Sequence, residues 1–172
     1  MEQSERKNRI LLSIQEGLEK NDANSWVFDL VESGKIEAFE ESVLEKFGYD
    51  DEEVSILFCD DEFIHEYNKR DRGIDSATDI LEYENGEEYE DEEGKWYIAG
   101  DMLISFETLP KNAEYFGVSQ NDELKRLLVH GTLHLNGYDH GEAHVEPGVE
   151  PTDEMLKMQE DALKDFKDVK LI

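Results

Sequence analysis

Cysteine, long apolar runs and basic side chains are all scarce in this chain of 172 residues. Its one cysteine, Cys59, cannot form an internal disulfide and lies in an apolar run, which predicts a buried strand residue in a reducing compartment. No run approaches the roughly 18 apolar residues of a membrane helix, and residues 1–7 show no apolar signal segment. These absences argue against a disulfide-stabilised secreted domain and a membrane protein, and they predict a cytoplasmic location.

Basic residues are outnumbered by acidic ones, with 17 Lys and Arg against 45 Asp and Glu, for a net charge of −28. Proteins that bind phosphate backbones usually present positive surface, so we do not expect tight nonspecific binding of nucleic acid. The acidic residues concentrate near 84–94 and 141–152, which we expect to be solvated loops. The alternative is that both segments form acidic rims that repel some partners or contact a basic one.

The few basic residues gather in two short segments of the sequence. One holds Lys69, Arg70 and Arg72, and the other holds Lys125 and Arg126. The two segments could form a local cationic strip on an otherwise acidic protein.

Hydrophobic periodicity predicts a mixed fold. Hydrophobic residues make up 38% of the chain and aromatic residues 10%, which favours folding over disorder. We expect strands over 9–15, 54–59, 78–83 and 96–105, and helices over 25–31, 36–47, 61–69, from 122 into His130, and from 152 onward. The first strand has an alternative, a helix that extends through Leu18. The pattern predicts an α+β fold, with a single layer of helices packed on a small mixed β-sheet, in one catalytic domain spanning 1–172.

Three of the five histidines fall within eleven residues, as His130, His134 and His140. Residues four apart share one face of a helix, so His130 and His134 can hold one ion between them. Gly137 suits the left-handed conformation that commonly ends a helix, and a turn there would bring His140 back toward the other two. Three imidazoles with one open position form the kind of site that binds a catalytic zinc ion. We therefore predict a metal site on this helix and the turn that follows it.

Gly131 separates this motif from that of the common zinc proteases. Metzincin peptidases read H-E-x-x-H-x-x-G-x-x-H, and Gly131 stands where they carry the glutamate that acts as general base. The motif therefore indicates a metal site but argues against an ordinary zinc protease. A glycine inside a helix costs roughly 0.5–1 kcal/mol relative to alanine. We expect that it leaves space for substrate or backbone close to the metal, the alternative being a tolerated weak position.

The histidine segment, H-G-T-L-H-L-N-G-Y-D-H, resembles the signature of the YbeY family, bacterial metal-dependent endoribonucleases of ribosomal RNA maturation. The similarity runs from about 54 to 166. It includes matches to the family pattern at Asn68, Arg72, Asp75, Thr78, Asp79, Leu81, Gly100, Asp101, Ile104 and Ser105. Met155, Gln159 and Glu160 fall in a C-terminal helix of the kind expected for the family. Departures occur at Asp71, Ala77, Glu82, Tyr83 and Asn136, where the family has Tyr, Pro, Ser, Phe and an apolar residue.

The resemblance implies an endoribonuclease that cleaves single-stranded ribosomal RNA in rRNA maturation and ribosome quality control. It implies one zinc ion per chain at His130, His134 and His140, and ribosomal RNA and ribosomal proteins as partners. Arg72 occupies the family's arginine position, so we predict a catalytic guanidinium that stabilises charge on the phosphoryl group. Two alternatives are a zinc-dependent hydrolase of a non-RNA substrate and a non-catalytic ribosome-associated factor with a structural metal.

Several other polar residues near the motif have less specific interpretations. Asp139 could orient a ligand histidine, or it could cap the turn after Gly137. We assign no chemistry to Asp79 and Asp101, which suit turns or strand ends. His65 and His144 lie outside the motif, and we expect both to be surface residues.

Overall fold

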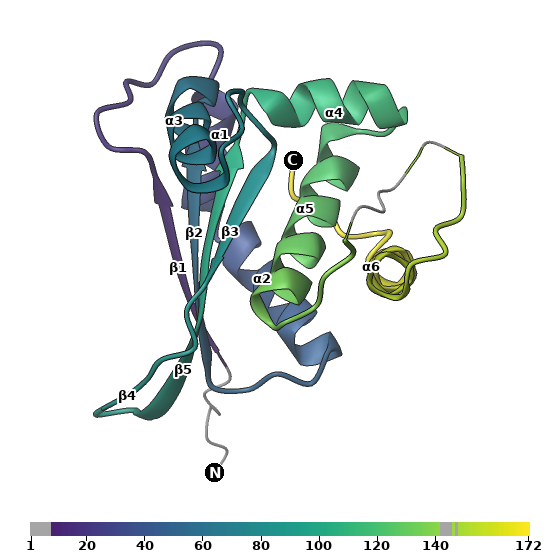
Figure 1. The fold of residues 1–172 in the computed structure, drawn as a ribbon. Helices are drawn as coiled ribbons and strands as arrows, with labels where there is room; N and C mark the ends of the chain where they lie inside the picture. Colours follow the sequence, from purple (N-terminus) through teal and green to yellow (C-terminus); the bar gives the residue numbers. More distant parts are fainter. Residues whose placement is uncertain (1–7, 142–145, 147) are drawn as a thin grey trace.

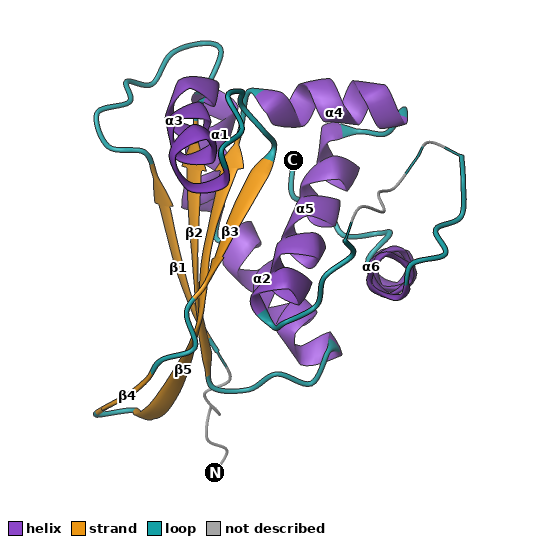
Figure 2. Ribbon diagram, viewed as in Figure 1, coloured by secondary structure: helices purple, strands orange, loops and turns teal. Residues whose placement is uncertain are grey.

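The computed structural model describes residues 8–141, 146 and 148–172 of the chain. Five strands form one mixed sheet: β1 (Arg9–Ile14), β2 (Glu52–Cys59), β3 (Ile80–Glu84), β4 (Glu88–Asp91) and β5 (Gly94–Ser105). The order is β1-β2-β5-β3, with β4 also paired to β5. β1 and β5 run parallel to β2, whereas β3 and β4 run antiparallel to β5 (Figure 2). The parallel pairing of β1 confirms the strand expected at 9–15 over the alternative helix.

Six helices complete the described part of the chain: α1 (Ser25–Ser33), α2 (Lys35–Lys46), α3 (Asp61–Arg72), α4 (Thr108–Phe116), α5 (Gln120–Leu135) and α6 (Glu154–Asp165). The α+β class, with helices packed on a small mixed sheet, is therefore confirmed. Among the described residues, no helix has the length and apolar character needed to cross a membrane.

The main core lies between one face of the sheet and the layer of helices that contains α2 and α5. Side chains alternate along a strand, and in β2 the buried residues Val54, Ile56 and Phe58 all point into this core. α5 packs on β3 and β5, and α6 packs on the outer side of α5 (Figure 1). The helix that carries the histidines is thus held between the sheet and a second helix.

α3 covers the opposite face of the sheet, beyond the single helical layer expected from the sequence. A smaller cluster there joins Ile64 of α3 to Cys59, Leu81 and Leu103 of the strands. Cys59 is fully buried, as its apolar surroundings predicted. Because α3 runs directly from β2 toward β3, its C-terminal end, with Arg72, lies close to the edge strand β3.

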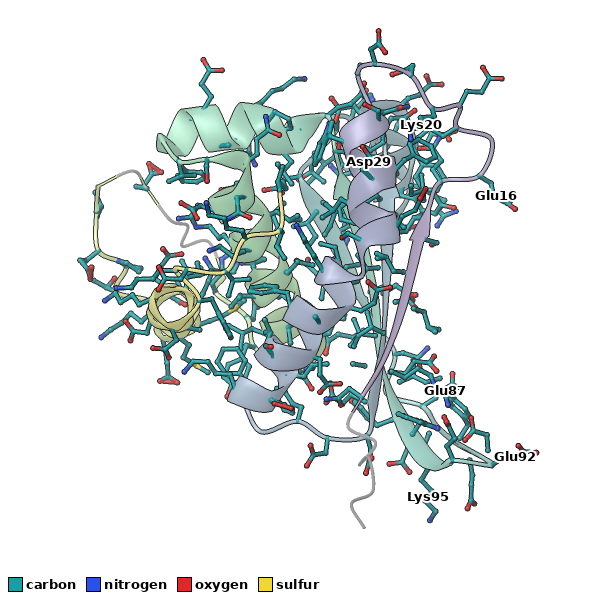
Figure 3. The ribbon with its side chains drawn as sticks, turned by 180° about the vertical axis from the view of Figure 1, so that it is seen from behind. Glu16, Lys20, Asp29, Glu87, Glu92 and Lys95 are labelled. Atoms are coloured by element: carbon teal, nitrogen blue, oxygen red, sulfur yellow. The ribbon has the colours of Figure 1, made fainter. Side chains whose placement is uncertain are left out.

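The acidic segment at 84–94 is not simply a loop, because β4 at its centre pairs with the start of β5 to form a hairpin. Arg9 holds this hairpin against β1 by donating to Tyr89 Oη (2.7 Å) and Asp91 Oδ2 (2.9 Å). Its guanidinium also lies 4.0 Å from the centre of the Trp96 ring. Figure 3 shows the labelled Glu87, Glu92 and Lys95 on this hairpin, which projects away from the end of the molecule that carries α6. Of the second acidic segment, residues 142–145 and 147 lie outside the described residues.

Candidate metal centre

The backbone around α5 brings the three motif histidines together. Ser119 caps the start of the helix by accepting from the Asp122 backbone N–H at 3.0 Å, and the helix ends at Leu135. Gly137 then adopts a positive φ of 93°, and the Tyr138 N–H donates to the Leu133 carbonyl at 3.0 Å. This turn reverses the chain, so that one ligand atom from each of His130, His134 and His140 lies within 4.8 Å of the other two.

The surroundings keep the helical histidines neutral at physiological pH. Burial, together with the neighbouring imidazoles, lowers the pKa of His134 to about 4. The pKa of His130 is also lowered, mainly by burial, although its hydrogen bond to Gln159 acts in the opposite direction. A metal ion binds the neutral form of imidazole through a nitrogen lone pair, so both side chains are ready to act as ligands.

Gln159 of α6 provides a partner for His130 that the sequence did not reveal. Its Oε1 lies 2.7 Å from His130 Nδ1, and the Gln159 side chain is only 1% exposed. The two residues are 29 positions apart, so no local spacing connects them. The only signal in the sequence was that Gln159 falls in a C-terminal helix of the kind expected for the family.

Glu82 brings a buried carboxylate to the same site from β3. Its Oε2 lies 3.7 Å from His130 Nε2 and, among the described residues, has no hydrogen-bond partner. Burial, together with the nearby Asp79 carboxylate, raises the pKa of Glu82 to about 7. A buried carboxylate oxygen without a partner is costly, and a cation beside it would remove that cost.

Gly131 has a different role from the one we expected. A Cβ atom at this position would lie 2.5 Å from Met102 Sδ and 3.1 Å from Ile80 Cδ1. Both side chains belong to the sheet and point into the core beneath α5. The glycine therefore lets α5 approach the sheet closely, and the space beside it is filled by the protein, not by substrate or passing backbone.

A small cavity lies next to the histidines. It has a volume of about 140 Å³ and is lined by residues that include Asp79, Ile80, Phe116, His130, His140 and Gln159. Its wall combines apolar and ionisable groups, as is common in sites where a small polar group binds.

Arg72 is connected to the histidines through a single residue, Glu82. Its guanidinium donates a hydrogen bond to the backbone carbonyl of Glu82 and lies 5.2 Å from the centre of the Tyr83 ring. The side chain of the same Glu82 reaches His130, and the charge of Arg72 acts on that carboxylate, so Glu82 links Arg72 to the candidate site. This position is compatible with the predicted contact to a phosphoryl group.

The two basic segments of the sequence differ in exposure: Lys69, Arg70 and Arg72 are exposed on α3, whereas Lys125 and Arg126 have internal partners and add nothing to a cationic strip. Lys125 is 2% exposed and donates to the Phe166 carbonyl at 2.8 Å. Arg126 donates to Glu123 and Glu160, and Arg70 donates to Asp71. Periodicity alone could not distinguish the internal contacts of Lys125 and Arg126 from a free basic surface.

The remaining polar residues have structural contacts. Asp139 Oδ1 accepts from the Gly141 N–H at 3.1 Å, which supports its role in capping the turn. Asp79 accepts from the Ile80 N–H and from Asn112 Nδ2, both at 2.8 Å, at the start of β3. Asp101 lies within β5, and burial raises its pKa. His65 is a surface residue that contacts Asp75 at 2.7 Å, and His144 lies outside the described residues.

The donor set fits a divalent transition metal. The site offers three imidazoles, two of them kept neutral by their surroundings, and an unsatisfied carboxylate oxygen nearby. Imidazole donors suit zinc and other first-row ions, and three protein ligands leave a coordination position open. Fold and site together define a small α+β protein with three histidines that could bind a metal ion, an arrangement also found in hydrolases.

Comparison with known proteins identifies the family. The family model described as Endoribonuclease YbeY matches residues 14–167. A Treponema denticola protein named Endoribonuclease YbeY is 46% identical over 138 residues, which are 80% of this chain and 85% of that protein. An Aquifex aeolicus protein with the same name is 37% identical over 134 residues, or 78% and 79% of the two chains. A solution structure of a Thermotoga maritima protein matches 92% of this chain and 87% of that one, with 25% identity and a TM-score of 0.48.

The chain therefore belongs to the endoribonuclease YbeY family, as its motifs predicted. Membership supports an endoribonuclease role, which is that of a nuclease in the hydrolase class.

Proposed function

We propose that this protein is a metal-dependent endoribonuclease that cleaves single-stranded ribosomal RNA during rRNA maturation and ribosome quality control. His130, His134 and His140 would hold one zinc ion per chain, and Arg72 would stabilise the phosphoryl group. The observation that carries the proposal is the convergence of three histidine ligand atoms within 4.8 Å, in a member of an endoribonuclease family. Ribosomal RNA is the proposed substrate, and ribosomal proteins are the proposed partners.

The chemistry assigns a separate task to each part of the site. A bound zinc ion would supply a Lewis acid that polarises a phosphoryl oxygen or lowers the pKa of a water molecule. Cleavage of a phosphodiester adds negative charge at phosphorus, and the guanidinium of Arg72 can stabilise that charge with aligned N–H donors. The three imidazoles would hold the ion.

The direct test is cleavage of an end-labelled ribosomal RNA fragment by zinc-loaded protein. We expect His134→Ala to abolish cleavage and Arg72→Met to reduce kcat/KM by about 10²–10³-fold, the loss typical of removing one charge-stabilising donor. Two matched controls are His65→Ala, an exposed histidine outside the cluster, and Arg70→Met, an exposed arginine on the same helix. Undiminished cleavage by the His134 or Arg72 variant would contradict the assignment.

Chelation separates the proposal from a non-catalytic factor with a structural metal. A structural zinc site contributes to folding, so its removal would unfold the protein. Here the histidine helix packs on the sheet through an extensive apolar core, and we expect the circular dichroism spectrum to survive chelation while cleavage is lost. Turnover of a peptide or amide panel without RNA cleavage would instead favour a hydrolase of another substrate.

A further inference from the structure

A chain of four polar side chains connects His130 to the contact between α5 and α6. His130 Nδ1 contacts Gln159 Oε1 at 2.7 Å, and Gln159 Nε2 donates to Glu160 Oε2 at 2.9 Å. Arg126 Nε donates to the same Glu160 oxygen at 3.1 Å. Gln159 is 1% exposed, so water has little access to its amide.

The chemistry of these groups fixes the orientation of the Gln159 amide. A carboxylate only accepts hydrogen bonds, whereas an amide has one acceptor oxygen and a nitrogen that donates. Glu160 therefore requires the amide nitrogen to face it, and this leaves Oε1 facing the imidazole. An acceptor at this position requires His130 Nδ1 to carry the proton.

The ring proton then determines which nitrogen of His130 can bind a metal. With the proton on Nδ1, the lone pair of the neutral ring is on Nε2. Nε2 is also the nitrogen nearest the unsatisfied Glu82 oxygen, at 3.7 Å. The hydrogen-bond chain thus selects the tautomer whose free lone pair is on this nitrogen.

Arg126 keeps Glu160 in place for this task. Its guanidinium donates to Glu160 on one side and to Glu123 Oε1 at 2.7 Å on the other. Glu123 is 1% exposed and the Arg126 side chain 15% exposed, so the guanidinium has little freedom to move. The carboxylate of Glu160 is consequently fixed relative to α5, the helix that carries His130.

We propose that Glu160, held by Arg126, is a positioning residue of the metal site. Glu160 fixes the orientation of the Gln159 amide, and the amide in turn selects the tautomer of His130 whose Nε2 is free to bind a metal ion. The inference rests on the metal site of the proposed function, but it concerns metal binding and not cleavage. The competing explanation is that Glu160 only joins α5 to α6 through its ion pair with Arg126.

The first measurement is the zinc affinity of purified protein, obtained by competition with a chromogenic chelator in the absence of RNA. Glu160→Met removes the acceptor at similar volume and lets the Gln159 amide rotate. We expect zinc affinity to fall by about 10–100-fold, the loss typical when a partner of a ligand histidine is removed. Asp161→Asn is the matched control, because Asp161 lies next along α6 and its side chain contacts only the exposed Lys164 among the interactions described.

A second substitution distinguishes positioning from helix packing. Gln159→Glu places a carboxylate beside His130, and a carboxylate accepts a hydrogen bond in either orientation. In the Gln159→Glu background, Glu160→Met should therefore change zinc affinity by less than about threefold. An equal loss in both backgrounds would show that Glu160 acts through packing and would overturn the proposal.

The tautomer itself is observable in the metal-free protein through the ¹⁵N chemical shifts of His130. We expect the Nδ1–H form in the wild type and a mixture of both forms in Glu160→Met. A wild-type Nε2–H form, or a wild type that binds no zinc, would overturn the proposal. Zinc binding that depends on Glu160 without any RNA cleavage would leave this inference standing and refute the proposed function.

Discussion

Replacing Gly131 with alanine tests whether the contact between α5 and the sheet positions the histidines. The added methyl group would lie 2.5 Å from Met102 Sδ, 3.0 Å from Met102 Cε and 3.1 Å from Ile80 Cδ1. Met102 is fully buried and Ile80 is 8% exposed, so neither side chain has open space into which to move. We expect α5 to shift away from the sheet and to carry His130 and His134 with it.

Two opposing contributions determine the size of the effect. Alanine favours a helix over glycine by roughly 0.5–1 kcal/mol, whereas overpacking a filled core costs about 1–3 kcal/mol. The clash should win because the closest atom is the Met102 sulfur, inside the side chain and not at its free end. We therefore expect Gly131→Ala to lower the free energy of unfolding by about 1–2 kcal/mol, measured by urea denaturation of metal-free protein.

A double-mutant cycle identifies the cause. Met102→Ala alone should cost about 2–5 kcal/mol because it leaves a cavity, and it should cost less in the Gly131→Ala background, where the new methyl group fills part of that cavity. Gly137→Ala is the control, since Gly137 has a φ of +93° and no atom within 4 Å of an added Cβ. It should be destabilised by its backbone conformation, with no coupling to Met102. A Gly131→Ala protein more stable than the wild type would refute this reasoning.

Three further predictions concern pH, the C-terminal segment and salt. Burial raises the pKa of Glu40 from 4.5 to about 8, so stability should fall as pH rises between these values. Glu40→Gln keeps an acceptor for Thr132 Oγ1, so its denaturation midpoint should exceed the wild type's at pH 8 and converge with it near pH 4.5. Equal midpoints at both pH values would contradict this. Lys125→Met removes the charged donor that Phe166 O shares with the Val169 N–H and that Val169 O shares with Asn121 Nδ2, and it should cost about 1.5–3 kcal/mol in thermal unfolding; an unchanged melting temperature would argue against it. If Arg72 contacts a phosphate, Arg72→Met should make the slope of log affinity for single-stranded RNA against log salt shallower by about 0.7, and Arg70→Met should not. This is measured on metal-free protein, and identical slopes for the two variants would refute the contact.

Much of the architecture could be predicted because burial imposes a period on the sequence. The alternation in β2, with Val54, Ile56 and Phe58 on one face, is visible without a structure. The spacing of His130, His134 and His140 around Gly137 likewise predicted that their side chains would meet. In both cases, local geometry determines the arrangement.

Other features could not be predicted, either because the element is too short to show a period or because distant residues create the feature. α4 is short and buries only Leu109 and Ala113, too few for a clear helical period. The acidic composition of 84–94 concealed β4. This strand is held by Arg9 of β1, which is an edge strand of the sheet and distant from β4 in the sequence. The reason for Gly131 depends on Met102, a residue of β5 that no spacing within the motif could identify.

The few basic side chains of this acidic protein are divided between internal contacts and a small exposed group on α3. Lys125 and Arg126 lie close to the histidines in sequence, yet both are committed to contacts that join α5 to the C-terminal segment and α6. These two side chains therefore hold other parts of the protein in place. Lys125 binds the chain after α6, and Arg126 binds the Glu160 carboxylate that orients Gln159. Arg72, by contrast, donates to the backbone carbonyl of Glu82 and lies over the Tyr83 ring, and it interacts with the nearby carboxylates of Asp71 and Glu82 through their charges. Recognition of RNA by such a site would depend on a few well-placed groups, and the overall charge of −28 would disfavour every RNA that does not reach them.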